Sequence, residues 1–326
     1  MNMPHSKSFI SRSLSVGGVR LPNRLAQAPM AGISGRAFRL QALRFGVGLA
    51  ATEMISSYGV HYRNRRTLEM LRLTHDEHPV SVQLFGNDPE LMAAAAVAAA
   101  EAGADLIDVN MGCPVRKVVK TGAGAALMGD GKLAARIVAA MTAAVPVPVT
   151  AKIRSGLGEV NAVPFGRKLA AAGAAAVCIH PRLAGQGLKG RADHGITRKL
   201  AEELDVPVIG SGDIDSPAAA AALLEAGCAM VMVGQAALGN PWIFADLLAG
   251  REPGRRPISE VLAEMSRFNA DLVEEVGPDS AARAMRKFYG WYLKPFKPDP
   301  QLRDGLRRAA GFEEAEALIR EAFSLD

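Results

Sequence analysis

The stretch Asp105-Leu-Ile-Asp-Val-Asn-Met-Gly-Cys113-Pro114 contains a short apolar run, Leu106–Val109, that one aspartate interrupts. Such a run is typical of a buried parallel strand. Gly112, which tolerates unusual backbone angles, and Pro114, which fixes φ, flank the cysteine. We therefore expect Cys113 to lie at the rim of a sheet, where its thiol can meet a ligand. A free cysteine is more often a small buried apolar side chain, so the ends of the other strands must decide between these interpretations.

Runs of the same kind recur along the chain, and each is followed by a helical stretch. The eight predicted strands are Leu25–Met30, Leu49–Thr52, Val80–Leu84, Leu106–Val109, Val147–Ile153, Val177–Ile179, Val206–Ile209 and Met230–Val233. Asp88-Pro89 and Ser216-Pro217 are typical helix starts. Eight strands alternating with helices predict an α/β fold, a (β/α)8 TIM barrel. A doubly wound sheet is the alternative, but the sequence lacks the Gly-rich fingerprint expected after its first strand.

The C-terminal ends of barrel strands are where such folds place their active sites. In strand order these ends carry Met30, Glu53, Gln83, Asn110, Lys152, His180, Ser211-Gly-Asp213 and Gly234. Glycine-containing loops over 211–217 and 234–242 follow the last two strands, where barrels often bind phosphate. Ordinary turns would explain either loop alone. A phosphorylated cofactor lying across the barrel mouth would explain both loops and the polar strand ends.

The alternation of strands and helices ends after Trp242-Ile-Phe. A linker rich in Pro, Gly and Arg spans 250–257. Four helices without intervening strands are predicted beyond it: Ser259–Val276, Asp279–Leu293, Pro300–Ala310 and Glu313–Phe323. The predicted division is a catalytic barrel over residues 1–247 and an all-helical domain over residues 248–326.

The predicted helical domain is strongly basic. Its central part carries Arg283, Arg286, Lys287, Lys294, Lys297, Arg303, Arg307 and Arg308, opposed only by Asp299 and Asp304. Five aromatic residues are interleaved with them: Phe288, Tyr289, Trp291, Tyr292 and Phe296. Cations bind phosphates and rings can stack on bases, which favours a nucleic-acid partner. The rings can equally form the core of the bundle.

Composition excludes several classes of protein. The chain has 326 residues, and a hydrophobic fraction of 49% excludes disorder. No apolar run approaches the length that crosses a bilayer. Three cysteines without a spacing pattern argue against a disulfide framework, so a cytoplasmic location is expected, with Cys178 and Cys228 as packing residues. Met1–Ser8 is expected to be a loose terminus. We predict no metal site, no membrane contact and a monomer.

Several short motifs occur in the order found in one known family. They are Ala28-Pro-Met-Ala-Gly32, Val82-Gln-Leu-Phe-Gly86, Val109-Asn-Met-Gly-Cys-Pro114, Lys152-Ile-Arg-Ser-Gly156, Ile179-His180, Gly212-Asp213 and Gly239-Asn-Pro-Trp242. With them the chain, from about Asn23 to its end, resembles the tRNA-dihydrouridine synthases, most of all the bacterial B-type members. The resemblance implies an FMN-containing barrel with a C-terminal helical domain. It also implies that NADPH is used to reduce one uridine of the tRNA D-loop.

The resemblance assigns roles to individual residues. Those expected to bind FMN are Pro29, Met30 and Ala31 against the flavin, Gln83 and Lys152 at the isoalloxazine edge, His180, and Ser211, Gly212, Asp213, Gly234 and Gln235 toward the phosphate. Asn110 and Arg154 are expected near the target uracil, and Cys113 is expected to be the proton donor. The basic helical domain is expected to grip the tRNA, with Arg286, Lys287 and Lys294 as candidate contacts.

The sequence departs from the family pattern at several of these positions. Ser211 stands where the family usually has Asn, and Gln235 stands where it usually has Arg. Without that arginine we expect FMN to be held more by backbone amides and to dissociate more easily. Ser34-Gly35 replaces a common Thr-Asp pair, and Pro181 and Leu183 alter a His-Gly-Arg-Thr segment.

The chemistry explains why a cysteine is wanted. The uracil C5=C6 bond is conjugated to the C4 carbonyl, so a hydride from reduced flavin adds at C6 and C5 then needs a proton. A thiol, with an ordinary pKa of about 8.5, stays protonated near neutral pH, whereas a carboxylic acid would be ionised. Two alternatives stay open: an FMN-dependent reductase of a small pyrimidine or enone, and a tRNA-binding protein that has lost catalysis.

Overall fold

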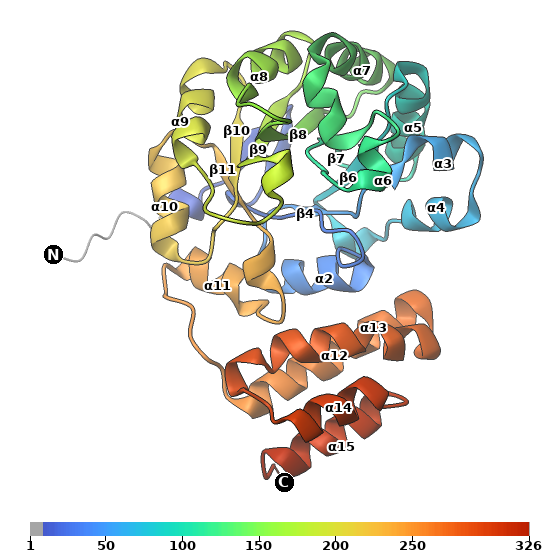
Figure 1. The fold of residues 1–326 in the computed structure, drawn as a ribbon, viewed down its shortest axis with the longest axis vertical. Helices are drawn as coiled ribbons and strands as arrows, with labels where there is room; N and C mark the ends of the chain where they lie inside the picture. Colours follow the sequence, from blue (N-terminus) through green and yellow to red (C-terminus); the bar gives the residue numbers. More distant parts are fainter. Residues whose placement is uncertain (1–8, 326) are drawn as a thin grey trace, which may run out of the picture.

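Eight parallel strands form the centre of the computed structural model, which describes residues 9–325 (Figure 1). The predicted loose terminus Met1–Ser8 lies outside the described residues. The strands are β3 (Leu25–Gln27), β4 (Ala50–Ala51), β6 (Val80–Phe85), β7 (Leu106–Met111), β8 (Val149–Gly156), β9 (Ala176–Leu183), β10 (Val208–Ser211) and β11 (Met230–Val233). They pair in the order β3-β11-β10-β9-β8-β7-β6-β4, and a parallel bridge between Ala26 and Leu49 joins the two ends. The predicted TIM barrel is confirmed.

Helices cover the outside of this barrel (Figure 1). They are α2 (Arg36–Arg44), α3 (Ser57–His61), α4 (Arg65–Met70), α5 (Pro89–Glu101), α6 (Arg116–Val119), α7 (Gly131–Ala144), α8 (Ala162–Ala171), α9 (His194–Glu203), α10 (Pro217–Glu225) and α11 (Trp242–Ala249). Short 3-10 turns lie between them: η1 (His75–Glu77), η2 (Gly124–Gly129), η3 (Ala184–Gln186) and η4 (Gln235–Ala237). The predicted caps hold: Asp88 accepts from the N–H of Glu90 at 2.9 Å, and Ser216 from that of Ala219 at 3.2 Å.

A short hairpin that we did not predict precedes the barrel. It consists of β1 (Leu14–Val16) and β2 (Val19–Leu21), joined by Gly17 and Gly18 with φ of +56° and +91°. Two consecutive residues with positive φ make a tight turn that glycine adopts without strain. The buried side chains of Val16 and Leu21 pack among those of Leu106, Ala176 and Met230. The hairpin therefore closes the N-terminal end of the barrel, opposite the predicted site.

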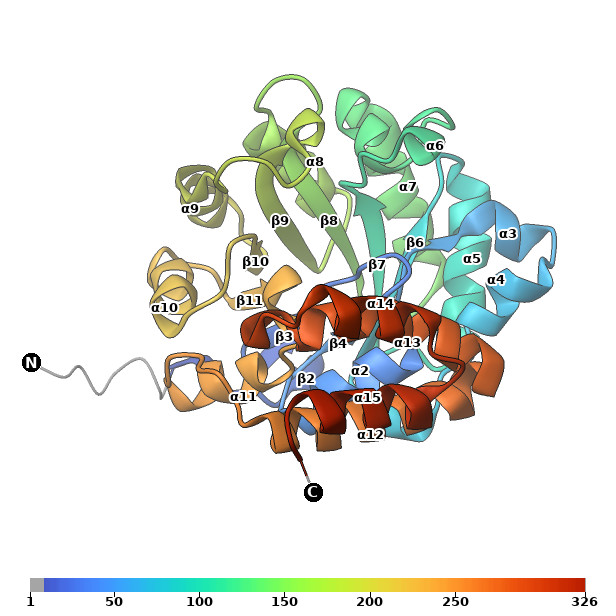
Figure 2. The same cartoon turned by 60° about the horizontal axis from the view of Figure 1, so that its bottom comes forward.

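The C-terminal part of the chain is helical, as predicted. It contains α12 (Ile258–Val276), α13 (Pro278–Tyr292), η5 (Lys294–Phe296), α14 (Pro300–Arg308) and α15 (Phe312–Ala322), which lie alongside one another (Figure 2). Among the interleaved aromatic residues Phe288, Tyr289 and Tyr292 are buried, and with Met285 they follow the spacing i, i+3, i+4, i+7 of a helix core face. These rings form the core of the bundle, so they do not offer a stacking surface for bases.

The helical part packs against α2. Gln41 Nε2 lies 2.7 Å from Glu264 Oε1 and 2.6 Å from the Tyr292 hydroxyl, and all three residues are buried. The carboxylate of Glu275 accepts from the N–H groups of Arg36 and Ala37, at 2.8 and 2.9 Å. These are the first two residues of α2, so α12 supplies the N-terminal cap of a barrel helix.

Among residues 9–325 no helix combines the length and apolarity that crossing a bilayer requires.

Candidate active site

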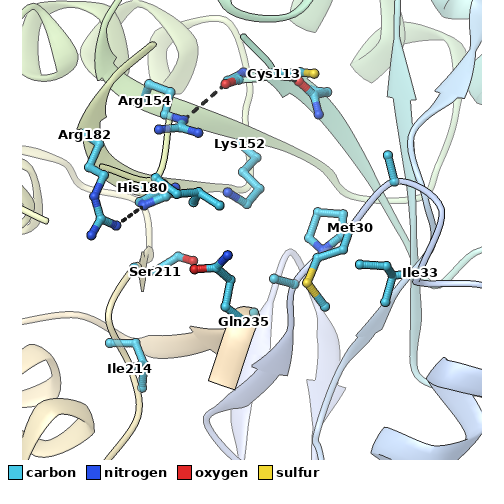
Figure 3. A pocket seen from close by; sticks show the side chains of 18 of the residues that line it. Met30, Ile33, Cys113, Lys152, Arg154, His180, Arg182, Ser211, Ile214 and Gln235 are labelled. Carbon is cyan, nitrogen blue, oxygen red and sulfur yellow. Dashed lines mark hydrogen bonds between the residues drawn. The ribbon is translucent and has the colours of Figure 1, made fainter. Parts of the chain in front are cut away.

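A cavity of about 560 Å³ opens at the C-terminal ends of the barrel strands (Figure 3). The barrel residues to which the resemblance assigns a role all line it: Pro29, Met30, Ala31, Gln83, Asn110, Cys113, Lys152, Arg154, His180, Ser211, Gly212, Asp213, Gly234 and Gln235. Glu53, at the end of the second predicted strand, lines a separate pocket instead. The side chains of Met30, Lys152 and Gln235 point into the cavity at the barrel mouth, Lys152 from β8 and the other two from the segments after β3 and β11 (Figure 3). A cavity of this size suits a cofactor or a small substrate.

Cys113 is held at the rim by Asn110. The side-chain oxygen Asn110 Oδ1 accepts from the backbone N–H groups of Gly112 and Cys113, at 3.2 and 2.9 Å. On its other side, Asn110 Nδ2 donates to Gln83 Oε1 at 2.8 Å. The thiol is partly exposed and lines the cavity, while Cys178 and Cys228 are buried packing residues, as predicted. Cys113 is therefore the cysteine that a ligand in the cavity can reach.

A buried carboxylate, that of Asp108, lies behind Gln83 and Asn110. Asp108 Oδ2 accepts from Gln83 Nε2, and Asp108 Oδ1 accepts from Thr150 Oγ1, both at 2.7 Å. Burial raises the pKa of Asp108, against the lowering effects of these two hydrogen bonds and of the Lys152 charge.

Two cations enter the cavity from β8. Lys152 lines the cavity, and its positive charge also acts on the buried Asp108. Arg154 is buried: its Nε donates to Gly112 O at 3.2 Å and its Nη1 to Gly187 O at 2.6 Å. Burial, with the nearby Arg182 charge, lowers the pKa of Arg154. Arg154 thus fixes the loop that carries Cys113 against the loop after β9.

Arg182 is a cavity residue that sequence reasoning missed. It is 4% exposed, its Nη2 lies 2.7 and 2.8 Å from the two Asp213 oxygens, and its Nη1 lies 2.8 Å from His180 Nε2. Because arginine can only donate, His180 Nε2 accepts, and the neutral ring carries its proton on Nδ1. Burial, followed by the charges of Lys152, Arg154 and Arg182, lowers the pKa of His180 to about 2. His180 therefore stays neutral across the physiological range.

The loop after β10 is shaped by close contacts. Gly212 has a φ of +103°, and a Cβ there would come within 2.7 Å of His180 Cδ2. Asp213 also adopts a positive φ, +55°. Burial acts to raise the pKa of Asp213, but hydrogen bonds from the Ala192 N–H and from Arg182, with the Arg182 charge, outweigh it and lower the pKa. The carboxylate is thus ionised and anchors Arg182.

Ser34, one of the departures from the family pattern, is a buried hydrogen-bonding residue. Its buried hydroxyl donates to Ala28 O at 3.2 Å and accepts from Met30 N and from Gln27 Nε2, both at 2.9 Å. One donor and two acceptor positions are all that a serine hydroxyl offers. Ser34 therefore fixes the segment that carries Pro29, Met30 and Ala31 in the cavity wall.

The three cations singled out in the helical part do not reach this cavity. Arg286 and Lys294 line a separate groove of about 720 Å³, together with Lys297, Arg303 and Arg307, and its lining includes no acidic side chain among the described residues. Lys287 instead donates to the backbone oxygen of Gly32, in the loop after β3. Burial lowers the pKa of Lys287, and the Glu53 charge partly offsets this. Arg286 and Lys294 thus form one surface, and Lys287 belongs to the contact with the barrel.

Comparison with known proteins identifies the family. The family described as Dihydrouridine synthase (Dus) matches residues 26–325. The chain belongs to the dihydrouridine synthase family. It is 36% identical over 318 residues to tRNA-dihydrouridine synthase B of Pseudomonas aeruginosa, covering 95% of each chain. It is 38% identical over 299 residues to tRNA-dihydrouridine synthase B of Proteus vulgaris, covering 89% of this chain and 92% of that protein.

This membership confirms the suspected resemblance to the B-type proteins and the prediction that the chain is an oxidoreductase. Solved structures show a similar fold at low identity. Histamine dehydrogenase from Rhizobium sp. 4-9 matches with a TM-score of 0.61 and 13% identity over 88% of this chain. A 2-naphthoyl-CoA reductase matches with a TM-score of 0.59 and 10% identity over 75% of this chain. The dihydrouridine synthase chain spans about half of each of these two proteins.

The position of Arg182 in this family member follows from β9. The strand continues through Pro181 to Leu183, so His180 and Arg182, two residues apart, lie on the same face. The register of β8 and β9 also pairs Arg154 with His180.

Among residues 9–325 no group of three or more His, Cys, Asp or Glu side chains is arranged to hold a metal ion.

Proposed function

We propose that this protein is a flavin-dependent tRNA-dihydrouridine synthase that reduces the C5=C6 bond of a D-loop uridine. The observation that carries the proposal is the cavity at the barrel mouth of a dihydrouridine synthase chain, with Cys113 fixed at its rim by Asn110. Bound reduced FMN would supply the hydride to C6, and NADPH would reduce the flavin again.

The residues of the cavity fit a flavin mononucleotide. Arg182 Nε is buried and has no hydrogen-bond partner in the described structure, although Arg182 lines the cavity. A ligand acceptor at this position would remove the cost of the unsatisfied donor. The residues that would hold the ring are Pro29, Met30, Ala31, Gln83, Lys152 and His180, and those that would hold the phosphate end are Ser211, Gly212, Asp213, Gly234 and Gln235. Positively charged Lys152 would favour an electron-rich ring beside it.

Cys113 is assigned as the proton donor to C5. Its thiol is accessible from the cavity, and its backbone is fixed by Asn110 and, through Ala125 N at 3.0 Å from Cys113 O, by the η2 turn. A general acid must be held within hydrogen-bond reach of the atom that it protonates. Asn110 and Arg154 would flank the uracil. Because the base lies stacked in folded tRNA, it must be turned out to enter the cavity, so the enzyme must also grip the RNA.

The direct test uses purified protein with FMN, NADPH and an unmodified tRNA transcript. We expect dihydrouridine to form in the D-loop, measured by nucleoside mass spectrometry, and no turnover of free uracil or a small enone. Turnover of the small molecules without RNA would instead identify a small-molecule reductase. Protein that binds tRNA but neither retains flavin nor forms dihydrouridine would be a binding protein without catalysis.

The basic groove of the helical part is the proposed tRNA grip. Replacing Arg286 and Lys294 together with glutamine should raise the KM for tRNA by about tenfold and lower its salt dependence by about one counterion per lost contact. The matched control is Lys132→Gln with Arg136→Gln, which removes two exposed cations from α7 on the outside of the barrel. Equal KM values for the two double variants would rule out the groove. Lys287→Gln tests the barrel contact separately.

A further inference from the structure

We propose that Asp108 is a positioning residue for the reaction: through Gln83 and Asn110 it fixes the orientation of the amides in the cavity wall and of the backbone that carries Cys113. The inference rests on the proposed function for its role in catalysis. The hydrogen-bond chain itself stands on the geometry alone.

The inner half of the chain is set by strand register. Gln83 of β6 is paired with Asp108 of β7, and Asp108 is paired with Thr150 of β8. Side chains of paired residues lie side by side on one face of a sheet. Here the face is the barrel interior, where Asp108 is only 7% exposed and accepts from Gln83 Nε2 and Thr150 Oγ1, both at 2.7 Å.

The direction of the outer half is fixed at its far end. The backbone N–H groups of Gly112 and Cys113 can only donate, so the side-chain atom of Asn110 that faces them must be its oxygen. Asn110 Nδ2 then faces Gln83, 2.8 Å from Gln83 Oε1. Gln83 must therefore turn Nε2 toward Asp108, where a carboxylate accepts.

Each amide in this chain could in principle be turned over, because its oxygen and nitrogen ends have nearly the same shape. Asp108 and the two backbone N–H groups make one direction consistent throughout. With this direction, Gln83 keeps one N–H for the cavity that it lines, and Asn110 Oδ1 keeps the Cys113 loop in place. Without an acceptor at position 108, Gln83 Nε2 loses its buried partner, so Gln83 is free to turn and Asn110 Nδ2 loses the acceptor that holds its outer end.

The test uses the two-way character of a threonine hydroxyl, which can donate or accept. In Asp108→Asn, the new side chain can still accept from Gln83 while its nitrogen donates to Thr150 Oγ1. In Thr150→Val, Asp108 still accepts from Gln83. Each single variant should therefore keep the direction of the chain. In the double variant the amide at position 108 can accept from Gln83 only by leaving its own N–H groups buried without a partner beside the valine at position 150, so its hold on Gln83 is weakened.

Two readouts need no substrate or cofactor: hydrogen exchange of the peptide that contains residues 111–114, and the alkylation rate of Cys113 by iodoacetamide. We expect both to stay within about twofold of wild type in the single variants and to rise by about tenfold in the double variant. Asp108→Leu, which removes the acceptor outright, should behave like the double variant. With tRNA, kcat should fall by about 10- to 100-fold while the KM is unchanged, because geometry and not binding is lost.

Additive effects of the two single changes, or exchange and alkylation in the double variant equal to wild type, would overturn the proposal. If Asp108→Leu does not fold, the near-isosteric double variant still decides it. The two substrate-free readouts also separate this inference from the proposed function. The wild-type protein could fail to modify tRNA while the Cys113 loop still loosens in the double variant. That result would refute the proposed function and support the role of the hydrogen-bond chain.

Discussion

Cys113→Ala is expected to reduce dihydrouridine formation by about two to four orders of magnitude, the range that a positioned general acid contributes. The reduction of bound flavin by NADPH should continue at the wild-type rate. The substitution is well suited to this question, because Asn110 holds residue 113 through its backbone N–H, which alanine retains. The loop should therefore keep its shape while the proton donor is lost. Rapid-mixing absorbance of the flavin and mass spectrometry of the tRNA measure the two steps separately.

Cys228→Ala is the matched control, since it removes a buried thiol that does not line the cavity. We expect it to leave both steps unchanged apart from a modest loss of stability. A Cys113→Ala protein that still forms dihydrouridine at more than a tenth of the wild-type rate would assign the proton to another group.

Glu77→Leu is expected to lower the free energy of unfolding by about 3–5 kcal/mol, the cost of leaving a buried partner charge unpaired. Glu77 is fully buried and bonds Arg39, which is 4% exposed. Its other oxygen accepts from Thr74 N at 2.9 Å. Arg39 also donates to Ser34 O at 2.8 Å, so the pair supports the segment that carries Met30 into the cavity. Urea unfolding followed by circular dichroism measures the change.

The control for this prediction is the double variant Arg39→Met with Glu77→Leu. Because apolar residues of similar volume often replace a buried ion pair at little cost, the double variant should be more stable than Glu77→Leu alone. Additive destabilisation would mean that the two residues contribute through separate packing and not as a pair.

The barrel could be predicted because its signals are local. Each barrel strand appears in the sequence as a short apolar run. N-cap residues such as Asp88 and Ser216 mark where helices begin. The hairpin at Leu14–Leu21 was missed although Gly17-Gly18 is a typical two-residue turn, because its strands are too short to show alternation. The spacing of Met285, Phe288, Tyr289 and Tyr292 likewise indicates a helix core face, but basic neighbours obscured it.

Some residues of the site were harder to predict, because a rule based on neighbouring residues gives the wrong end for a strand. Pro181 lacks the N–H that a strand ladder uses, so the sequence predicts a strand that ends before it, at Ile179. In the structure β9 continues to Leu183 and carries Arg182 into the cavity. The Asp108 network was also out of reach, because its partners are set by the register between β6, β7 and β8. No spacing along the chain reveals that register.

The position of α2 has a consequence for how such chains can change over time. This helix is capped by Glu275, its Arg44 pairs with Asp271 at 2.7 Å, and its Gln41 is buried against Glu264 and Tyr292. In sequence α2 belongs to the barrel, but these polar partners lie more than two hundred residues away. If the C-terminal helices were exchanged for those of a relative, α2 would therefore lose these specific polar partners. An exchange that keeps these contacts would have to move α2 together with the C-terminal helices, and not only the residues beyond the linker at 250–257.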